Sequence, residues 1–155
     1  MLSNSTCTAT RRLLRDFIPR GSLDAACVYF PDPWSDDKGA HRRIVNPFLL
    51  ALLEPCMRTG EAVGEAVTGG NVTPPRLHLS TDDAAYSAHM LQVMAAAEDT
   101  GRWVAEPRDE ASGAPAGGVM LGRAGSTKYE ERGRAQGSSI HNFCYRFVGG
   151  ENGSE

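Results

Sequence analysis

Apolar residues that recur every three or four positions predict three helices. The first covers residues 8–18 and ends at Pro19. The second begins at Asn46–Pro47, because asparagine is a preferred N-cap and proline is favoured at the first helical position, and Pro55 ends or kinks it. The run Thr81–Asp82–Asp83 caps the third. In chain order, the apolar faces consist of Leu13, Leu14, Phe17 and Ile18; Phe48, Leu49, Leu52, Leu53, Cys56 and Met57; and Tyr86, Met90, Leu91, Met94 and Ala97.

Alternating or continuous apolar runs predict four strands, at residues 24–30, 76–80, 103–105 and 141–148. Helices and strands then alternate along most of the chain, which is the pattern of an α/β sheet. Two segments rich in small residues, 60–75 and 107–125, show no sustained period. We expect both to be inserted or flexible loops, and we expect residues 149–155 to form a disordered tail.

Composition supports one domain. The chain has 155 residues, of which 41% are hydrophobic, and this is enough to bury one core. Its net charge of −3 does not by itself predict a nucleic-acid partner. All but two of its cationic residues are arginine, however, and several cluster, for example at Arg42–Arg43. Arginine suits phosphate binding, although a solvated surface explains each cluster equally well.

The cysteines argue against a metal centre and against disulfides. Cys7, Cys27, Cys56 and Cys144 lie far apart in the sequence, so we expect buried, reduced thiols in an intracellular protein. We expect no metal ion to be bound. No segment has the roughly 20 consecutive apolar residues of a membrane span, and the first ten residues do not resemble a signal peptide. The sequence therefore predicts a soluble protein.

A carboxylate with a restricted backbone stands at the end of the first strand, in Phe30–Pro31–Asp32–Pro33–Trp34. Each proline fixes its own φ, and a residue before proline favours the extended region, so Asp32 has little backbone freedom. Ligands of open α/β sheets bind beyond the carboxyl ends of the strands. A turn in which Asp32 only accepts hydrogen bonds is the alternative, but two prolines and two aromatic residues are more than a turn requires.

This string resembles the signature of the tRNA (guanine-N7)-methyltransferases, which are class I S-adenosylmethionine-dependent enzymes with a Rossmann-like sheet. Three more segments follow in the order of that family. They are Arg42–Arg43 with the residues to Leu49, Leu77 to Asp82 with Tyr86 and His89–Met90 beyond, and Thr127 to Gly133. The resemblance extends from about Thr8 to Val148 and implies transfer of a methyl group to N7 of a guanine in the tRNA variable loop.

The resemblance also implies site residues. Asp32 matches the catalytic acid, which lies against the cofactor as well, and Thr8–Ala9 falls where the family contacts adenine. The substrate-binding positions are Asp36, Asp82, Thr127, Lys128, Tyr129 and Glu130. S-adenosylmethionine is the implied cosubstrate and tRNA the implied partner. A eukaryotic source would add a WD-repeat subunit and a nuclear location, whereas a bacterial source would imply the cytoplasm.

Several features depart from the family pattern. Thr8 replaces an acid or amide, and Asp36 stands near a position that is usually basic, with Lys38 and His41 close by. The strand, glycine-rich turn and helix that hold the cofactor in class I methyltransferases have no counterpart, because none of the Gly-Gly pairs follows a predicted strand. We therefore expect residues 1–148 to form only the carboxyl-terminal half of such a domain.

Three alternatives stay open on the sequence. Asp82 is equally well explained as an acid at a helix N-terminus, where it would interact with amides and the helix dipole. The chain could be an amino-group methyltransferase of the same fold, although Thr127 to Gly133 argues against this. It could also be a truncated, inactive protein that only binds tRNA or a partner.

Overall fold

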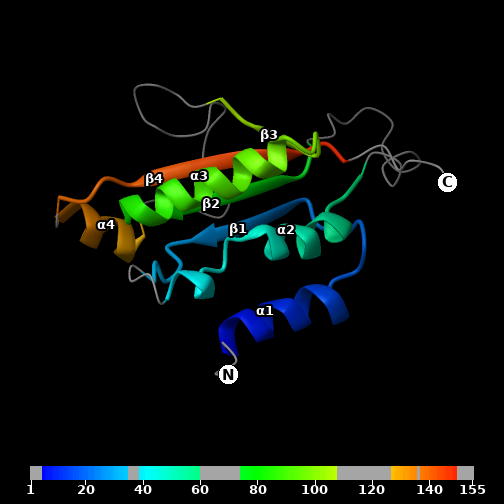
Figure 1. The fold of residues 1–155 in the computed structure, drawn as a ribbon, viewed down its shortest axis with the longest axis horizontal. Coiled ribbons are helices and arrows are strands. Elements are labelled where there is room, and N and C mark those ends of the chain that lie inside the picture. The colour runs from blue at the N-terminus through cyan, green and yellow to red at the C-terminus, as the bar shows by residue number, and fades with distance from the viewer. Residues whose placement is uncertain (1–4, 35–38, 60–73, 108–126, 136, 150–155) are drawn as a thin grey trace.

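The chain folds as a four-stranded sheet with helices packed on one face (Figure 1). The computed structural model describes residues 5–34, 39–59, 74–107, 127–135 and 137–149. The main elements in chain order are α1 (Ser5–Asp16), β1 (Ala25–Tyr29), α2 (Pro47–Leu53), β2 (Arg76–Thr81), α3 (Ala84–Glu98), β3 (Trp103–Ala105), α4 (Lys128–Ala135) and β4 (His141–Phe147). Short 3-10 helices occupy Ala40–Arg42 (η1) and Glu54–Cys56 (η2).

The strand order is β1-β2-β4-β3. β1 and β2 are parallel, and β4 lies between β2 and β3, antiparallel to both. Within the described part of the chain β1 therefore has one neighbour and one open edge. Parallel strands joined through a helix, followed by an antiparallel hairpin-like end, confirm the predicted α/β sheet and match the carboxyl-terminal half of a class I methyltransferase sheet.

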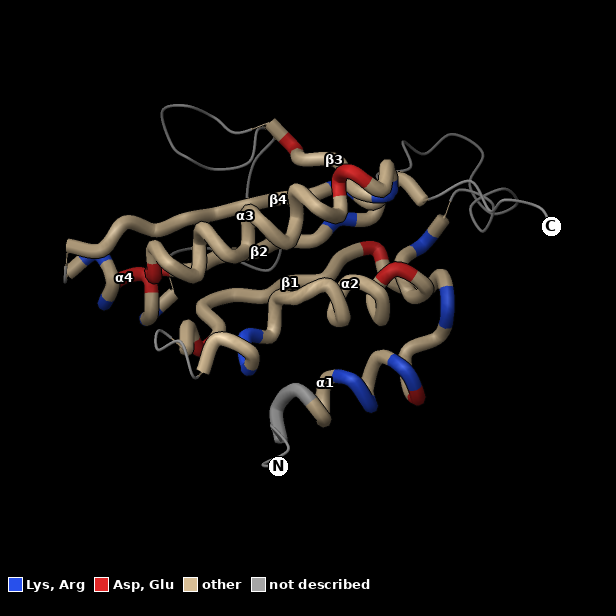
Figure 2. The backbone as a smooth tube through the Cα atoms, viewed as in Figure 1, with Lys and Arg blue, Asp and Glu red and all other residues tan. Residues whose placement is uncertain are grey.

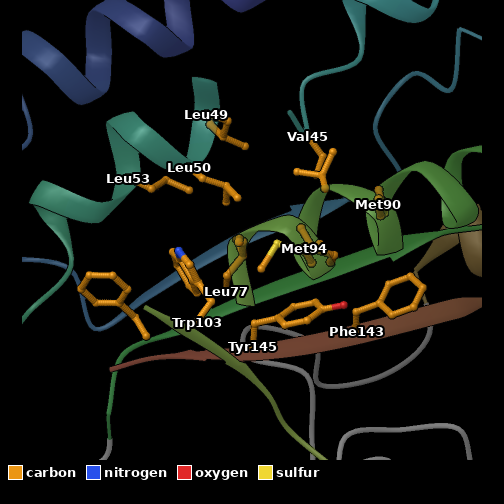
Figure 3. Packing of buried hydrophobic residues seen from close by; sticks show 14 of the residues in the cluster. Val45, Leu49, Leu50, Leu53, Leu77, Met90, Met94, Trp103, Phe143 and Tyr145 are labelled. Atoms are coloured by element: carbon orange, nitrogen blue, oxygen red, sulfur yellow. The ribbon is translucent and has the colours of Figure 1, made fainter. Parts of the chain in front are cut away.

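Strand register places the core on one face of the sheet. Leu77 lies opposite Tyr145, and Leu79 lies opposite Phe143, so these side chains share a face. α3 contacts β2 and β3, and α2 contacts α3, so both helices cover this face. Figure 3 shows Met90 and Met94 of α3 packed between the strands and Val45, with Trp103 beside Leu77. The core of the described part of the chain thus lies between the sheet and these helices.

The predicted helix caps are confirmed. The Asn46 side chain accepts a hydrogen bond from the Leu49 amide at 3.0 Å, with Pro47 at the first helical position. Asp83 accepts from the Tyr86 amide at 2.6 Å and begins α3. α2 ends at Leu53, one residue before the 3-10 turn that contains Pro55, because proline at that point cannot continue the α-helical hydrogen bonds.

Part of the predicted apolar surface is exposed instead of buried. Leu13, Phe17, Phe48 and Leu91 are 51%, 66%, 45% and 43% exposed, and among the α1 residues whose burial is described, from Thr8 to Asp16, Leu14 alone is buried. The helix itself runs from Ser5 to Asp16, not from residue 8 to 18. α1 lies beyond α2, next to the open edge of β1 (Figure 1), so few described elements are present to cover its apolar face.

The cysteine prediction is confirmed in part. Cys56 and Cys144 are buried and in no disulfide, whereas Cys27 is exposed, so the expectation of burial is wrong there. Cys27 points away from the helix-covered face, because its neighbours Ala26 and Val28 pack against the core. Among the described residues, no helix has the length and apolarity needed to span a membrane.

The sequence did not predict α4. The segment Lys128–Ala135 is short and strongly polar, so it lacks the apolar period that identifies the other helices. The predicted loops and tail lie mostly outside the described residues, which omit 60–73, 108–126 and 150–155. Asp36 and Lys38 also lie outside them.

Candidate functional site

The loop that follows β1 holds Asp32 between two residues with unusual backbone angles. Phe30 has φ of 48° and Trp34 has φ of 44°, which is the left-handed region that side chains normally avoid. The Phe30 amide donates to the Ser80 carbonyl at 2.8 Å, so the chain turns away only after the pairing with β2 is complete. Asp32 is exposed at the carboxyl end of the sheet. The restricted loop predicted around Asp32 is present.

Two arginines support this loop through contacts with Pro33 and Trp34. The Arg43 Nε donates to the Pro33 carbonyl at 2.8 Å, and its guanidinium lies 5.2 Å from the centre of the Tyr86 ring. Arg42 lies 4.8 Å from the centre of the Trp34 ring. The sequence suggested either phosphate binding or a solvated surface for these residues. Their contacts show that they hold the loop of Asp32, a role that sequence reasoning missed, and phosphate binding stays a prediction.

Tyr86 connects this loop to α3. The Val45 amide donates to the Tyr86 hydroxyl at 3.1 Å, and burial raises the pKa of Tyr86 so that the hydroxyl stays protonated. His89, one turn along α3, bonds the Val45 carbonyl at 2.9 Å. The segment between η1 and α2 is thereby fixed against the core.

Asp82 is the second acid at this end of the sheet. It follows β2, which is parallel to β1 and ends beside it, since Tyr29 lies opposite Ser80. Asp82 is exposed, and the hydrogen bond that caps α3 is made by the next residue, Asp83. The alternative role of satisfying the helix amides therefore falls to Asp83. The Asp82 carboxylate is oriented toward α4, on the side of Gly133.

α4 approaches both strand ends through residues four positions apart. The Tyr129 ring stacks on the Phe30 ring, with centroids 6.2 Å apart and planes at 19°. A Cβ atom on Gly133 would lie 3.3 Å from the Asp82 Cβ and 3.4 Å from its Oδ2. The helix thus contacts the end of β1 with one residue and the end of β2 with the other. In this way the structure brings Asp32, Asp82 and the Thr127 segment to one end of the sheet.

The remaining predicted residues of α4 differ in accessibility. The Thr127 hydroxyl accepts from the Glu130 amide at 3.2 Å and begins the helix. Glu130 is 5% exposed, and its Oε1 accepts from the Arg134 guanidinium at 2.7 Å. Lys128 and Tyr129 are exposed. Substrate contacts from Lys128 and Tyr129 therefore need no rearrangement, whereas Glu130 is already engaged within its own helix.

A cavity of about 570 Å³ opens beside Asp32, between β1 and α1. Its walls are mainly apolar, with Asp32, Thr10 and Arg42 among the polar residues that line it. Thr8 and Ala9 do not line the cavity; they are exposed on the same helix, within one turn of Thr10. Figure 2 shows that α1 also carries several basic residues, which are Arg11, Arg12 and Arg15. Arg12 and Arg15 pair with Asp16, at 3.9 and 2.7 Å.

No group of three or more metal-binding side chains converges among the residues that the structure describes. The described residues also include no glycine-rich turn next to β1. Exposed polar side chains at this end of the sheet include Asp32, Asp82, Lys128 and Tyr129.

Comparison with known proteins identifies the family of the chain. The family model described as "Putative methyltransferase" matches residues 2–143. A tRNA (guanine-N(7)-)-methyltransferase of Aeromonas hydrophila is 30% identical over 148 residues, which are 92% of this chain and 51% of that protein. Proteins of the same name from Alkalilimnicola ehrlichii and Saccharophagus degradans are 32% identical over 134 residues and 36% identical over 85 residues. These matches cover 86% and 55% of this chain, and 47% and 31% of the relatives.

The chain thus spans about half the length of the curated relatives that it matches across most of its own length. The shared part includes all three segments that meet at the ends of β1 and β2. Taken together, the sheet topology and these matches show that the chain belongs to the class I methyltransferase family whose named relatives are tRNA (guanine-N7)-methyltransferases.

Proposed function

We propose that this chain forms the substrate side of a tRNA (guanine-N7)-methyltransferase, which transfers a methyl group from S-adenosylmethionine to N7 of a guanine in the tRNA variable loop. One observation carries the proposal: Asp32 and Asp82 are exposed carboxylates at the ends of two adjacent parallel strands. The names of the relatives agree with it.

The proposed reaction needs acids more than a strong base. Guanine N7 has a free lone pair, so attack on a methyl group requires no deprotonation, while the purine becomes positively charged as the bond forms. A carboxylate held in place stabilises that charge. In this scheme Asp82 accepts from N1–H and the exocyclic amine and orients the base. Asp32 lies between the base and the cofactor and stabilises the charge that develops there.

The residues around Asp32 fit one wall of a cofactor site. The cavity of about 570 Å³ is within the usual range for small-molecule sites, roughly 300–1,000 Å³, and it combines apolar walls with few polar groups. Asp32 and Thr10, which line the cavity, would hold the cofactor, and Thr8 and Ala9 stay predicted contacts because they lie on α1 outside it. When bound, S-adenosylmethionine supplies the electrophilic methyl group. The residues of this chain contribute its orientation and the negative charge beside it.

Other expectations stay predictions. They are a basic contact near Asp36, a WD-repeat subunit, an intracellular location, nuclear or cytoplasmic according to the source, and the absence of a bound metal ion.

Methylation of an unmodified tRNA transcript tests the proposal. The chain is assayed as it is and fused behind the amino-terminal half of the Aeromonas hydrophila relative, and the product is digested to identify the methylated atom. We expect Asp32→Asn in the fusion to reduce the single-turnover rate on the order of 100-fold, because a well-placed electrostatic group contributes about that much. Unchanged turnover would exclude Asp32 from the mechanism. Methylation at another atom or base would contradict the proposed function.

Asp99→Asn is the matched control. Asp99 is exposed and follows α3, so it lies one helix length of about 22 Å from the end at which Asp82 precedes the same helix. The same loss of charge there should leave the rate unchanged.

The open edge of β1 yields a second prediction. Within the described part of the chain β1 pairs with a strand on one side only, next to an apolar cavity and to exposed Leu13 and Phe17, and an edge of this kind favours pairing with other chains. We expect the 155-residue chain alone to aggregate and not to bind S-adenosylmethionine in calorimetry. The fusion should be monodisperse and bind it. A monomeric chain that binds the cofactor at micromolar concentration would show that the open edge of β1 neither causes aggregation nor prevents cofactor binding.

A further inference from the structure

Tyr129 is an exposed aromatic residue at the candidate site. It is 65% exposed, although it is aromatic and lies at the end of the sheet that carries both acids. One face of its ring rests on Phe30, at 6.2 Å between centroids and with nearly parallel planes. Its position is therefore fixed by a stacking contact while much of its surface is open to solvent.

Phe30 is itself immobilised. Its amide is bonded to the Ser80 carbonyl, and its φ of 48° is held by the prolines and pairing around it. Backbone strain of this kind persists where the surrounding structure determines it, and such positions concentrate at functional sites. Phe30 thus provides a rigid support for the Tyr129 ring.

Tyr129 lies one helical turn from the point at which α4 approaches Asp82. Tyr129 and Gly133 are four residues apart, so they lie on the same face of α4 and are separated by about 6 Å along its axis. The Asp82 side chain lies beside Gly133, since a Cβ atom added there would be 3.4 Å from its Oδ2. A purine that stacks on Tyr129 would therefore extend its hydrogen-bonding edge toward the Asp82 carboxylate.

We propose that Tyr129, supported by Phe30, is the stacking platform for the target guanine after that base leaves the tRNA stack. This inference rests on the proposed function and adds how the base is held. Enzymes that act on a base commonly extrude it and hold it by stacking and by hydrogen bonds to one edge. Here Tyr129 provides the stacking surface and Asp82 the acceptor for the edge.

Binding measurements that combine removal of the target base from the tRNA with a change of Tyr129 test this stacking platform. Affinity is measured for tRNA with guanine at the target position and for the same tRNA lacking only that base, with the wild-type fusion and with Tyr129→Leu. The wild type should prefer the complete tRNA by roughly 5- to 150-fold, equivalent to the 1–3 kcal/mol that one stacked base contributes. Tyr129→Leu should bind both tRNAs about equally, and Tyr129→Phe should keep the preference. Phe30→Leu, which removes only the support, should lose part of it.

Two results would overturn the platform. One is a wild-type protein with no preference between the two tRNAs, and the other is a Tyr129→Leu variant that keeps the full preference. Equal weakening of both tRNAs by Tyr129→Leu would show a surface contact instead. Failure of the proposed function has a different signature, since the wild-type fusion would then bind without forming 7-methylguanine.

Discussion

The contact between α4 and Asp82 can be tested by adding a single methyl group. Gly133 lies inside a helix, where glycine costs about 1 kcal/mol relative to alanine. Gly133→Ala should recover that energy if the space beside it were open. The new Cβ would instead lie 3.1 Å from the Ile140 Cδ1 and 3.3 Å from the Asp82 Cβ. Overpacking of this kind costs typically 1–3 kcal/mol.

The two effects nearly cancel in stability but not in activity. The Ile140 Cδ1 is the end of a flexible side chain and can move, whereas the Asp82 Cβ is fixed to the backbone and must shift with it or push α4 away. We expect the free energy of unfolding to fall by about 0–2 kcal/mol, the difference between these terms. Displacing a positioning group by 1 Å can cost on the order of 100-fold in rate. A shift of a few tenths of an ångström should therefore reduce methyl transfer about tenfold.

Single-turnover methylation and thermal unfolding of the fusion measure both quantities. Gly101→Ala is the matched control, because Gly101 has φ of 72° and nothing within 4 Å of its added Cβ. That change should destabilise the protein by about 1 kcal/mol or more and keep full activity. The double variant Gly133→Ala/Ile140→Val removes the Cδ1 contact and should stay impaired. A Gly133→Ala variant that is more stable and fully active, or a double variant in which the Ile140 change restores activity, would contradict this prediction.

Two further predictions concern charge. Lys128→Ala and Arg132→Ala should weaken tRNA binding and flatten its salt dependence, by roughly 0.9 in the log-log slope for each phosphate that the protein no longer neutralises. Arg102→Ala should change neither, because Arg102 follows the carboxyl end of α3, away from the end next to Asp82. Unchanged slopes for the Lys128 and Arg132 variants would mean that these residues form only a solvated surface. His78 is 5% exposed, neither of its ring nitrogens has a hydrogen-bond partner in the described part of the chain, and burial lowers its pKa. The unfolded state therefore binds more protons below about pH 6.5, and stability should fall there by up to about 1.4 kcal/mol per pH unit. Denaturation of His78→Leu should lack this loss, and parallel curves for the two proteins would contradict the argument.

The sequence by itself determined the features of this protein that depend only on neighbouring residues. The caps at Asn46 and Asp83 are visible in the sequence because side-chain bonds to the first helical amides depend only on neighbours. The alternation around Leu77 and Leu79 identified β2, because side chains of a strand point alternately to opposite faces. Proline on both sides identified Asp32 as a restricted residue.

Tertiary structure decided what these signals could not. α4 has a weak apolar pattern, and it is placed by the contacts of Tyr129 with Phe30 and of Gly133 with Asp82, which join segments about 50 to 100 residues apart. The positive φ of Phe30, a residue before proline, follows from pairing with β2 and not from local preference.

Exposure was equally beyond the sequence. Leu14 and Leu13 are adjacent residues of similar hydrophobicity, yet one is buried and the other is 51% exposed. A helical period shows which residues share a face, but whether another element covers that face depends on the strands and helices beside it. At the open edge of β1, the described part of the chain supplies no such element. The sequence therefore indicated which residue types form the candidate site, and long-range packing determined how these residues are brought together.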